Sequence, residues 1–346
     1  MSEQINHPND WIKQDTDTTW YSVIGQEQLT QNLKNALGYR KISHAYMIQG
    51  EKHAGKRMIA DIFARALQCE SEGNKPCNVC RSCKQALNKN HPDIIYVEHD
   101  KPNVISVENV RTQINADIAI KPYSGPYKIY IMSDAQLMNQ QAQNAILKTL
   151  EEPPEYAVIL LLTTNVEAML QTILSRCVVL NIKPVSNDLI KNHLMEKVHI
   201  PDYRASICAS FARGNVGRAI RLASNEEFDE LKSETLHMLK KVLDLEVYQM
   251  AAAAKKITEE KYDVNDYLDL CFIWYRDILL YKSCNDSMHL IFKEELMDIA
   301  TLAQSYTYEA IEHIIREIEH ARNRWKSNVN FELTMEILFM EMQKVR

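Results

Sequence analysis

The chain has no long apolar stretches, no signal-peptide pattern in its first residues and no excess of positive charge. No apolar run approaches the ~18 residues that can span a bilayer, so we expect no membrane anchor. Residues 1–17 lack the basic and apolar regions of a signal peptide, which favours a cytoplasmic location. The formal net charge of −6 argues against a protein that follows long stretches of nucleic acid with its own surface.

The composition is that of a globular protein with room for more than one domain. The 346 residues are 46% hydrophobic and 25% charged, which is ordinary for a soluble chain. This length predicts two or three domains, and no internal repeat is visible. Four of the eight cysteines are scattered and are expected to be structural or incidental thiols: Cys177, Cys208, Cys271 and Cys284.

The stretch Gly50–Lys56 has the G-x-x-x-x-G-K spacing of a phosphate-binding loop. It lies between an apolar run predicted as a strand (44–49) and a helical pattern (58–67). This context favours a true phosphate loop over a coincidental match, because the helix N-terminus adds partial positive charge. The next residue is Arg57, where Ser or Thr would ligate Mg²⁺. Since a guanidinium cannot ligate a metal, the sequence predicts a nucleotide loop without its metal corner.

A cluster of cysteines follows with the spacing C-x7-C-x2-C-x2-C. Four thiolates at short spacing match a structural, tetrahedral Zn²⁺ site and leave no position for a catalytic water. A redox C-x-x-C pair or four unmetallated thiols are the alternatives. His91 and His99 lie nearby, but we expect ordinary roles for them because four cysteines suffice. The predicted ligands are Cys69, Cys77, Cys80 and Cys83.

Five apolar runs alternate with helical patterns in the first half of the chain. The alternation predicts an α/β domain with a parallel sheet and helices on both faces. Ser133-Asp134 follows the third run, where phosphate-loop ATPases place an acidic pair that orders Mg²⁺. Only one carboxylate is present there. The predicted strands are 44–49, 93–98, 127–132, 158–162 and 177–182.

Pro184 marks the predicted end of the α/β domain. A glycine-containing stretch (212–219) then predicts a helix–turn–helix junction within a small helical domain. Apolar faces at helical spacing in 264–279 and 310–321 predict a packed bundle or an oligomer interface. The expected division is a leader (1–19), the α/β domain (20–183), a small helical domain (184–224) and a larger helical domain (225–346).

Taken in order, five motifs resemble the clamp-loader subunits of bacterial DNA polymerase III, a family of AAA+ ATPases. The resemblance covers most of 20–220, and its last two motifs are specific in combination. It implies an AAA+ domain with a zinc-binding insert, a helical lid domain and an all-α collar domain for oligomerisation. The motifs are V-I-G-Q (23–26), the phosphate loop, the four-cysteine insert, N-A-I-L-K-T-L-E-E-P-P (144–154) and S-R-C (175–177).

Two subunit types of this family share the pattern. The gamma/tau motor type keeps Ser or Thr after the loop lysine and an Asp-Glu pair after the third strand. This chain has Arg57 and Ser133-Asp134 there, and both departures remove metal chemistry. The resemblance is therefore closest to the delta-prime type, a stator that assists the motors without hydrolysing ATP. We expect no intrinsic ATPase, and the sequence leaves open whether the loop binds ATP or Mg²⁺.

The resemblance also implies residue roles. Arg176 matches an arginine finger offered in trans to a neighbouring subunit's ATP, although an ion pair with a local carboxylate is the alternative. Thr164 and Asn165 match sensor 1, and Arg218 matches sensor 2; in an inactive site these three can be purely structural. What remains of the chain's own nucleotide site would be Gly50, Gly55, Lys56, Arg57 and Asp134.

The implied partners are the gamma/tau motors and the delta subunit in a hetero-pentamer, the sliding clamp, and primed DNA reached through the complex. Two other functions compete with this interpretation. The first is a self-sufficient ATPase of the gamma/tau type, against which Arg57 and Ser133 argue. The second is a zinc-containing nucleic-acid-binding module, against which the acidic net charge argues.

Overall fold

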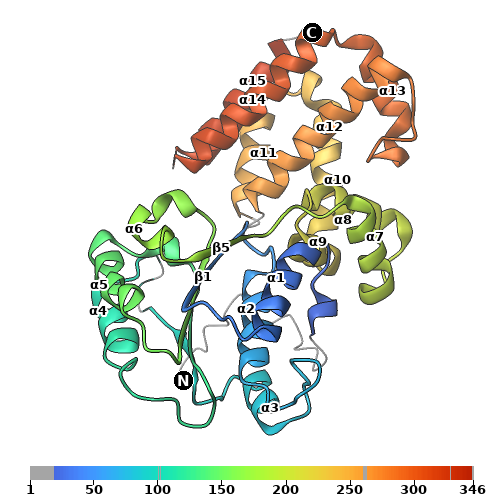
Figure 1. Cartoon of the computed structure of the whole chain (residues 1–346). Helices are drawn as coiled ribbons and strands as arrows, with labels where there is room; N and C mark the ends of the chain where they lie inside the picture. Colours follow the sequence, from blue (N-terminus) through green and yellow to red (C-terminus); the bar gives the residue numbers. More distant parts are fainter. Residues whose placement is uncertain (1–18, 100, 102, 260–262, 328, 345–346) are drawn as a thin grey trace, which may run out of the picture. The chain divides into compact units, whose positions relative to one another are not determined.

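The computed structural model describes residues 19–99, 101, 103–259, 263–327 and 329–344, and these form two compact units (Figure 1). The first unit runs through Leu189 and takes in Arg213–Arg218. The second consists of Ile190–Ala212 and the chain from Ala219 onward. The finer division into lid and collar stays a prediction, and the predicted leader falls almost entirely outside the described residues.

The first unit is built on a five-stranded sheet in the order β2-β3-β4-β1-β5. Every pairing in it is parallel, as the alternating sequence pattern predicts. The phosphate-loop position directly follows the strand that lies between β4 and β5. The strands are β1 (Ala45–Gln49), β2 (Ile94–Val97), β3 (Lys128–Met132), β4 (Ala157–Thr163) and β5 (Val178–Asn181).

Helices cover both faces of this sheet (Figure 1). Alternate strand residues point to opposite faces, so Tyr46 and Ile48 join one core while Ala45 and Met47 join the other. The first core packs α1 (Glu27–Gly38) and α2 (Lys56–Leu67), followed in the chain by α3 (Arg81–Leu87). The second packs α4 (Val107–Val110), α5 (Gln140–Glu151) and α6 (Gln171–Leu174). Short turns of helix complete the unit: η1 (Trp20–Ser22), η2 (Arg111–Asn115), η3 (Ala135–Leu137) and η4 (Val166–Ala168).

The V-I-G-Q motif fixes the chain where it leaves the sheet. The Gln26 side chain donates from Nε2 to the Lys183 carbonyl (2.6 Å) and accepts from the Lys183 N–H at Oε1 (2.9 Å). Gly25 has φ +65°, and a Cβ there would lie 2.8 Å from a methyl of Val185. A glycine and a buried amide side chain are therefore both needed at this junction.

In the described residues of the second unit, all regular secondary structure is helical. Its core includes edge-on contacts of Phe211 with Phe228 and Phe292. Two ion pairs tie α12 (Val264–Cys284) to its neighbours, Arg221–Asp266 (3.2 Å) and Arg322–Asp269 (2.7 Å). The helices predicted over 264–279 and 310–321 lie inside α12 and α14 (Tyr308–Lys326).

The helices from α7 onward follow one another closely along the chain. No helix among the described residues is long and apolar enough to cross a bilayer. They are α7 (Asn187–His193), η5 (Leu194–Val198), α8 (Asp202–Ala212), α9 (Val216–Ser224), α10 (Glu226–Lys241), η6 (Val242–Asp244), α11 (Val247–Glu259), α12 (Val264–Cys284), η7 (Lys293–Glu295), α13 (Leu296–Ser305), α14 (Tyr308–Lys326) and α15 (Phe331–Lys344).

Candidate nucleotide site and metal centre

The loop between β1 and α2 has the form of a phosphate loop, but its lysine is turned back onto it. The Gly50 N–H donates to the Thr163 carbonyl (3.1 Å), and Gly55 takes φ +87°, which favours glycine. Lys56 Nζ donates to the carbonyl oxygens of Gly50 and Glu51, both at 2.7 Å. Burial lowers the pKa of Lys56, although the carboxylates of Asp134 and Glu51 oppose that shift.

The segment Arg213–Arg218 packs against this loop within the first unit. Asn215 Nδ2 donates to the Lys52 carbonyl at 2.8 Å. A Cβ on Gly217 would lie only 2.1 Å from the His53 carbonyl oxygen, so this approach requires glycine. The proposed sensor-2 residue Arg218 is therefore next in the chain to a backbone contact with the loop. Asn215 was not predicted from the sequence, although the nearby Gly214 and Gly217 were visible there.

Arg57 occupies the position after the loop lysine at which motor subunits of this pattern have a metal-ligating Ser or Thr. Its Nη1 donates to Ser133 Oγ (2.9 Å) and its Nε pairs with Asp61 Oδ1 (3.2 Å). The guanidinium carbon also lies 4.1 Å from the centre of the Tyr96 ring, a cation–π contact. The two departures from the motor pattern, at 57 and 133, therefore contact each other. The Arg57 guanidinium, a permanent cation, therefore bridges the first turn of α2 and the residue that follows β3.

The Arg57 contacts predict a small, specific stability effect. Arg57→Ala is expected to lower the free energy of unfolding by about 1 kcal/mol, because it removes a hydrogen bond, a partly exposed ion pair and a cation–π contact. Burial raises the pKa of Asp61 and the Arg57 charge counteracts this, so the loss also leaves that carboxylate less well compensated. Urea unfolding measures the change. Lys52→Ala, an exposed cation of the same loop, is the control; equal effects of the two substitutions would contradict the proposed contacts.

Polar groups at the ends of β3 and β4 form a second bridge. Gln136 donates from Nε2 to Asp134 Oδ1 (3.2 Å) and accepts at Oε1 from the Thr163 hydroxyl and the Thr164 N–H, both at 3.1 Å. Asn165 Oδ1 accepts from the N–H of Glu167 (2.9 Å) and caps a short helical turn. The sensor-1 candidates thus have local structural contacts. Gln136 was missed, and its place two residues after Asp134 is the signal that could have found it.

Arg176 lies in the turn before β5, toward the opposite end of the strands from the loop. It precedes β5, whose first residue Val178 pairs with Tyr46, whereas its last residue pairs with Gln49 beside the loop. At about 3.3 Å per residue, the start of β5 lies roughly 13 Å before Gly50 along the strands, and Arg176 lies in the turn that precedes it. Arg176 is therefore placed away from this chain's own loop.

The Arg176 guanidinium is held by local contacts. Nη1 donates to the Thr172 carbonyl (2.8 Å), and Nη2 forms an ion pair with Glu151 Oε1 (2.9 Å). The pair with a local carboxylate, considered as an alternative from the sequence, is thus present. Both side chains are partly exposed, and such pairs are worth about 0–1 kcal/mol. The contact is therefore compatible with a further role toward a partner.

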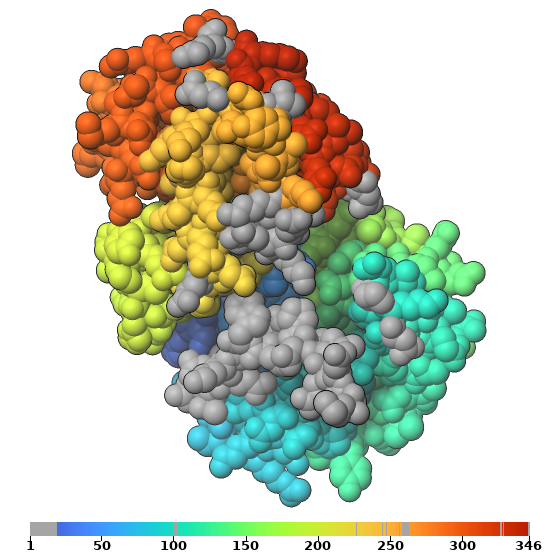
Figure 2. Space-filling view, turned by 180° about the vertical axis from the view of Figure 1, so that it is seen from behind, coloured from blue at the N-terminus to red at the C-terminus, as the bar shows by residue number. Residues whose placement is uncertain are grey.

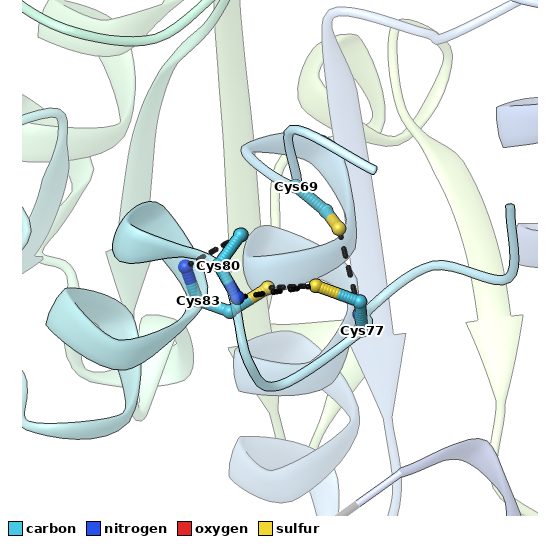
Figure 3. A group of neighbouring side chains, drawn as sticks. All are labelled: Cys69, Cys77, Cys80 and Cys83. Carbon is cyan, nitrogen blue, oxygen red and sulfur yellow. Dashed lines mark hydrogen bonds between the residues drawn. The ribbon is translucent and has the colours of Figure 1, made fainter. Parts of the chain in front are cut away.

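The four clustered cysteines converge as the spacing predicts (Figure 3). All four sulfur atoms lie within 4.8 Å of one another. Tetrahedral Zn–S bonds of ~2.3 Å place sulfurs ~3.8 Å apart, so the set fits a four-coordinate ion after a small contraction. The N–H groups of Cys77, Cys80 and Cys83 each donate to the sulfur of the preceding cysteine at 3.4 Å.

Other contacts fix this insert and use the nearby histidines. Trp20 Nε1 donates to the Lys75 carbonyl (2.8 Å), which ties the insert to the start of the described chain. His91 is buried, accepts from the Asp93 N–H at Nδ1 (3.1 Å) and shares a hydrogen bond with Ser82 at Nε2 (3.0 Å). Burial lowers its pKa despite nearby carboxylates. In the space-filling view, this part of the chain (cyan) lies at the surface (Figure 2).

Two family models match the chain. One, described as DNA polymerase III, delta subunit, matches residues 25–186, and its C-terminal counterpart matches 226–344. The chain belongs to the clamp-loader subunits of DNA polymerase III. The family confirms the resemblance drawn from the five motifs, and the parallel sheet and phosphate-loop topology confirm the predicted fold class.

Two curated relatives agree with this family, and one solved structure is similar in part. The chain is 28% identical over 323 residues to DNA polymerase III subunit delta' of Bacillus subtilis, covering 92% of this chain and 96% of that protein. It is 31% identical over 283 residues to subunit tau of the same organism, covering 75% of this chain but 50% of tau. A solved gamma subunit-related protein from Thermotoga maritima is 21% identical, with a TM-score of 0.41, covering 90% of this chain and 99% of that one.

Proposed function

We propose that this chain is the stator of a clamp loader: it does not hydrolyse ATP itself, and it completes the ATP site of a neighbouring motor subunit. The contact between Arg57 and Ser133 (2.9 Å) carries the first half of the proposal. These two residues stand where the motor pattern has a metal-ligating hydroxyl and an acidic group. Their hydrogen bond holds the Arg57 guanidinium at the place where Mg²⁺ would bind, and its positive charge repels Mg²⁺.

The placement of Arg176 supports the second half. A guanidinium aimed at a γ-phosphate stabilises transition-state charge and is worth roughly 10³–10⁵ in rate in related phosphoryl-transfer systems. Arg176 lies toward the opposite end of the strands from its own loop, and this placement supports a role toward a phosphate on another molecule. Loss of the chain's own metal site therefore leaves this role intact.

Zn²⁺ at the cysteine insert (69–83) completes the proposal as a structural cofactor. Four protein sulfurs fill a tetrahedral ion, so the metal would stabilise the insert and leave no position for a reacting water. The names of the relatives, delta' and tau, support gamma/tau motors and delta as the other members of a hetero-pentamer. The sliding clamp and primed DNA are the substrates we propose for that complex.

The stator proposal predicts that the purified chain alone turns over no ATP. We expect Mg²⁺-dependent turnover within background, unchanged by Lys56→Ala, because both metal-ordering positions are altered. Steady-state phosphate release at saturating ATP measures this. The control is the same chain reconstituted with motor subunits, delta, clamp and primed DNA, where turnover appears. Turnover by the isolated chain that Lys56→Ala abolishes would favour the alternative, a gamma/tau-type ATPase.

A further inference from the structure

The carboxylate that holds Arg176 comes from a different helix. Glu151 is the last residue of α5, and its Oε1 lies 2.9 Å from Arg176 Nη2. Thr172 and Ser175, on the chain just before Arg176, accept from Nη1 at 2.8 and 3.3 Å. We propose that Glu151 is the positioning residue of Arg176, holding the guanidinium in the orientation in which it meets the neighbouring subunit's nucleotide. This inference rests on the proposed function.

The contacts of Arg176 leave one edge of the guanidinium for a ligand. An arginine has five N–H donors. Within the described part of the chain, Nη1 donates to Thr172 and Ser175, and Nη2 pairs with Glu151. Nε and Nη2 of a guanidinium can together form a fork that matches two phosphate oxygens. Glu151 can therefore stay bound while the finger acts, so it aims the finger and does not compete with it.

The end of α5 fixes where Glu151 stands. Helix C-termini carry partial negative charge, which adds to the attraction of the carboxylate for a cation. Glu152 leaves the helical conformation with φ −126°, and Pro153 follows it, so the helix cannot extend. Glu151 is thus held on the last turn of a helix packed on the sheet, while Glu152 beside it has no ion pair with Arg176. Glu152 is therefore a matched control for substitutions of Glu151.

A positioning role of Glu151 can be distinguished from a purely structural one by measuring stability and turnover separately. An exposed ion pair contributes little to stability. Both side chains are partly exposed, at 35% for Arg176 and 49% for Glu151. We therefore expect Glu151→Ala to leave the unfolding midpoint of the chain unchanged. The effect should appear in turnover, where a small misplacement of a reacting group is costly.

The experiment uses the reconstituted complex with clamp and primed DNA and measures kcat and KM for ATP. At the ATP site that this chain completes, Glu151→Ala should lower kcat about fivefold with KM unchanged, since the finger acts in the transition state. Glu151→Gln, which keeps an acceptor oxygen without the charge, should fall between Glu151→Ala and the unaltered chain. Glu152→Ala should have no effect. In an Arg176→Ala background, Glu151→Ala should cause no further loss, because the two residues act as one unit.

The outcomes separate this inference from the proposed function. If Arg176→Ala itself leaves turnover unchanged, the finger proposal fails and the Glu151 role fails with it. If Arg176→Ala lowers turnover but Glu151→Ala does not, the positioning role alone is wrong. An equal loss from Glu151→Ala with and without Arg176 would also overturn it, because the effect would then not pass through the guanidinium.

Discussion

Removal of metal from the purified chain is expected to unfold the cysteine insert and to lower the stability of the first unit. Structural zinc contributes on the order of 10–16 kcal/mol of apparent binding free energy in small zinc modules. The insert has one short helix, α3, and two of its four clustered cysteines, Cys69 and Cys83, are buried. The four sulfur atoms lie within 4.8 Å of one another. Without a bound ion, nothing offsets the cost of holding four thiols this close together.

Three measurements check this expectation. Elemental analysis of the purified chain should find about one zinc equivalent, as one four-cysteine set requires. After treatment with a strong chelator, hydrogen exchange should rise in 69–91 while the strands β1 and β4 stay protected. Tryptophan emission should shift as well, because the Trp20 indole donates to Lys75 in the insert.

Single substitutions distinguish a metal site from ordinary buried thiols. Cys83→Ser should abolish zinc binding and reproduce the exchange pattern of the chelated chain. Cys284→Ser, an exposed cysteine outside the cluster, is the matched control and should change neither. If Cys83→Ser fails to accumulate, Cys77→Ser, at a less buried ligand, gives the same test. A fully protected insert in a metal-free chain would show that zinc is not needed there.

The sheet was predictable because its signals are local. Each strand is a short apolar run bounded by polar residues or glycine, and all five predicted runs overlap the observed strands. Parallel pairing followed from the helices between them. The cysteine site was predictable for the same reason, since its ligands lie within a few residues of one another. These features need only the periodicity and spacing that a single sequence carries.

The contacts that define the site join distant positions, and one sequence does not encode them visibly. Arg57 and Ser133 were each recognised as departures from the motor pattern, but their hydrogen bond spans 76 residues of chain. Gly217 looked like part of a helix junction, and its role as the close approach to His53 depends on how the chain returns to the loop. Tertiary packing decides such contacts, so the sequence could supply the residues but not the pairs.

Replacement of Arg176 by alanine is expected to produce the largest functional effect. At the ATP site this chain completes, turnover should fall by roughly 10³-fold, the lower end of what an arginine finger contributes. Turnover of the whole reconstituted complex should fall by at least that site's share. Folding should be unaffected, because the exposed pair with Glu151 is worth about 0–1 kcal/mol. Single-turnover phosphate release in the presence of clamp and primed DNA measures the effect.

Two variants make this prediction specific to the guanidinium. Arg176→Lys keeps the charge but loses the planar fork, so it should recover only a small part of the rate. Arg111→Ala removes an exposed arginine elsewhere in the same unit and should leave turnover unchanged. Assembly, followed by gel filtration, should be the same for all three variants. Full turnover in an assembled Arg176→Ala complex would remove this residue from the mechanism, and the chain would then assist its neighbours through contact alone.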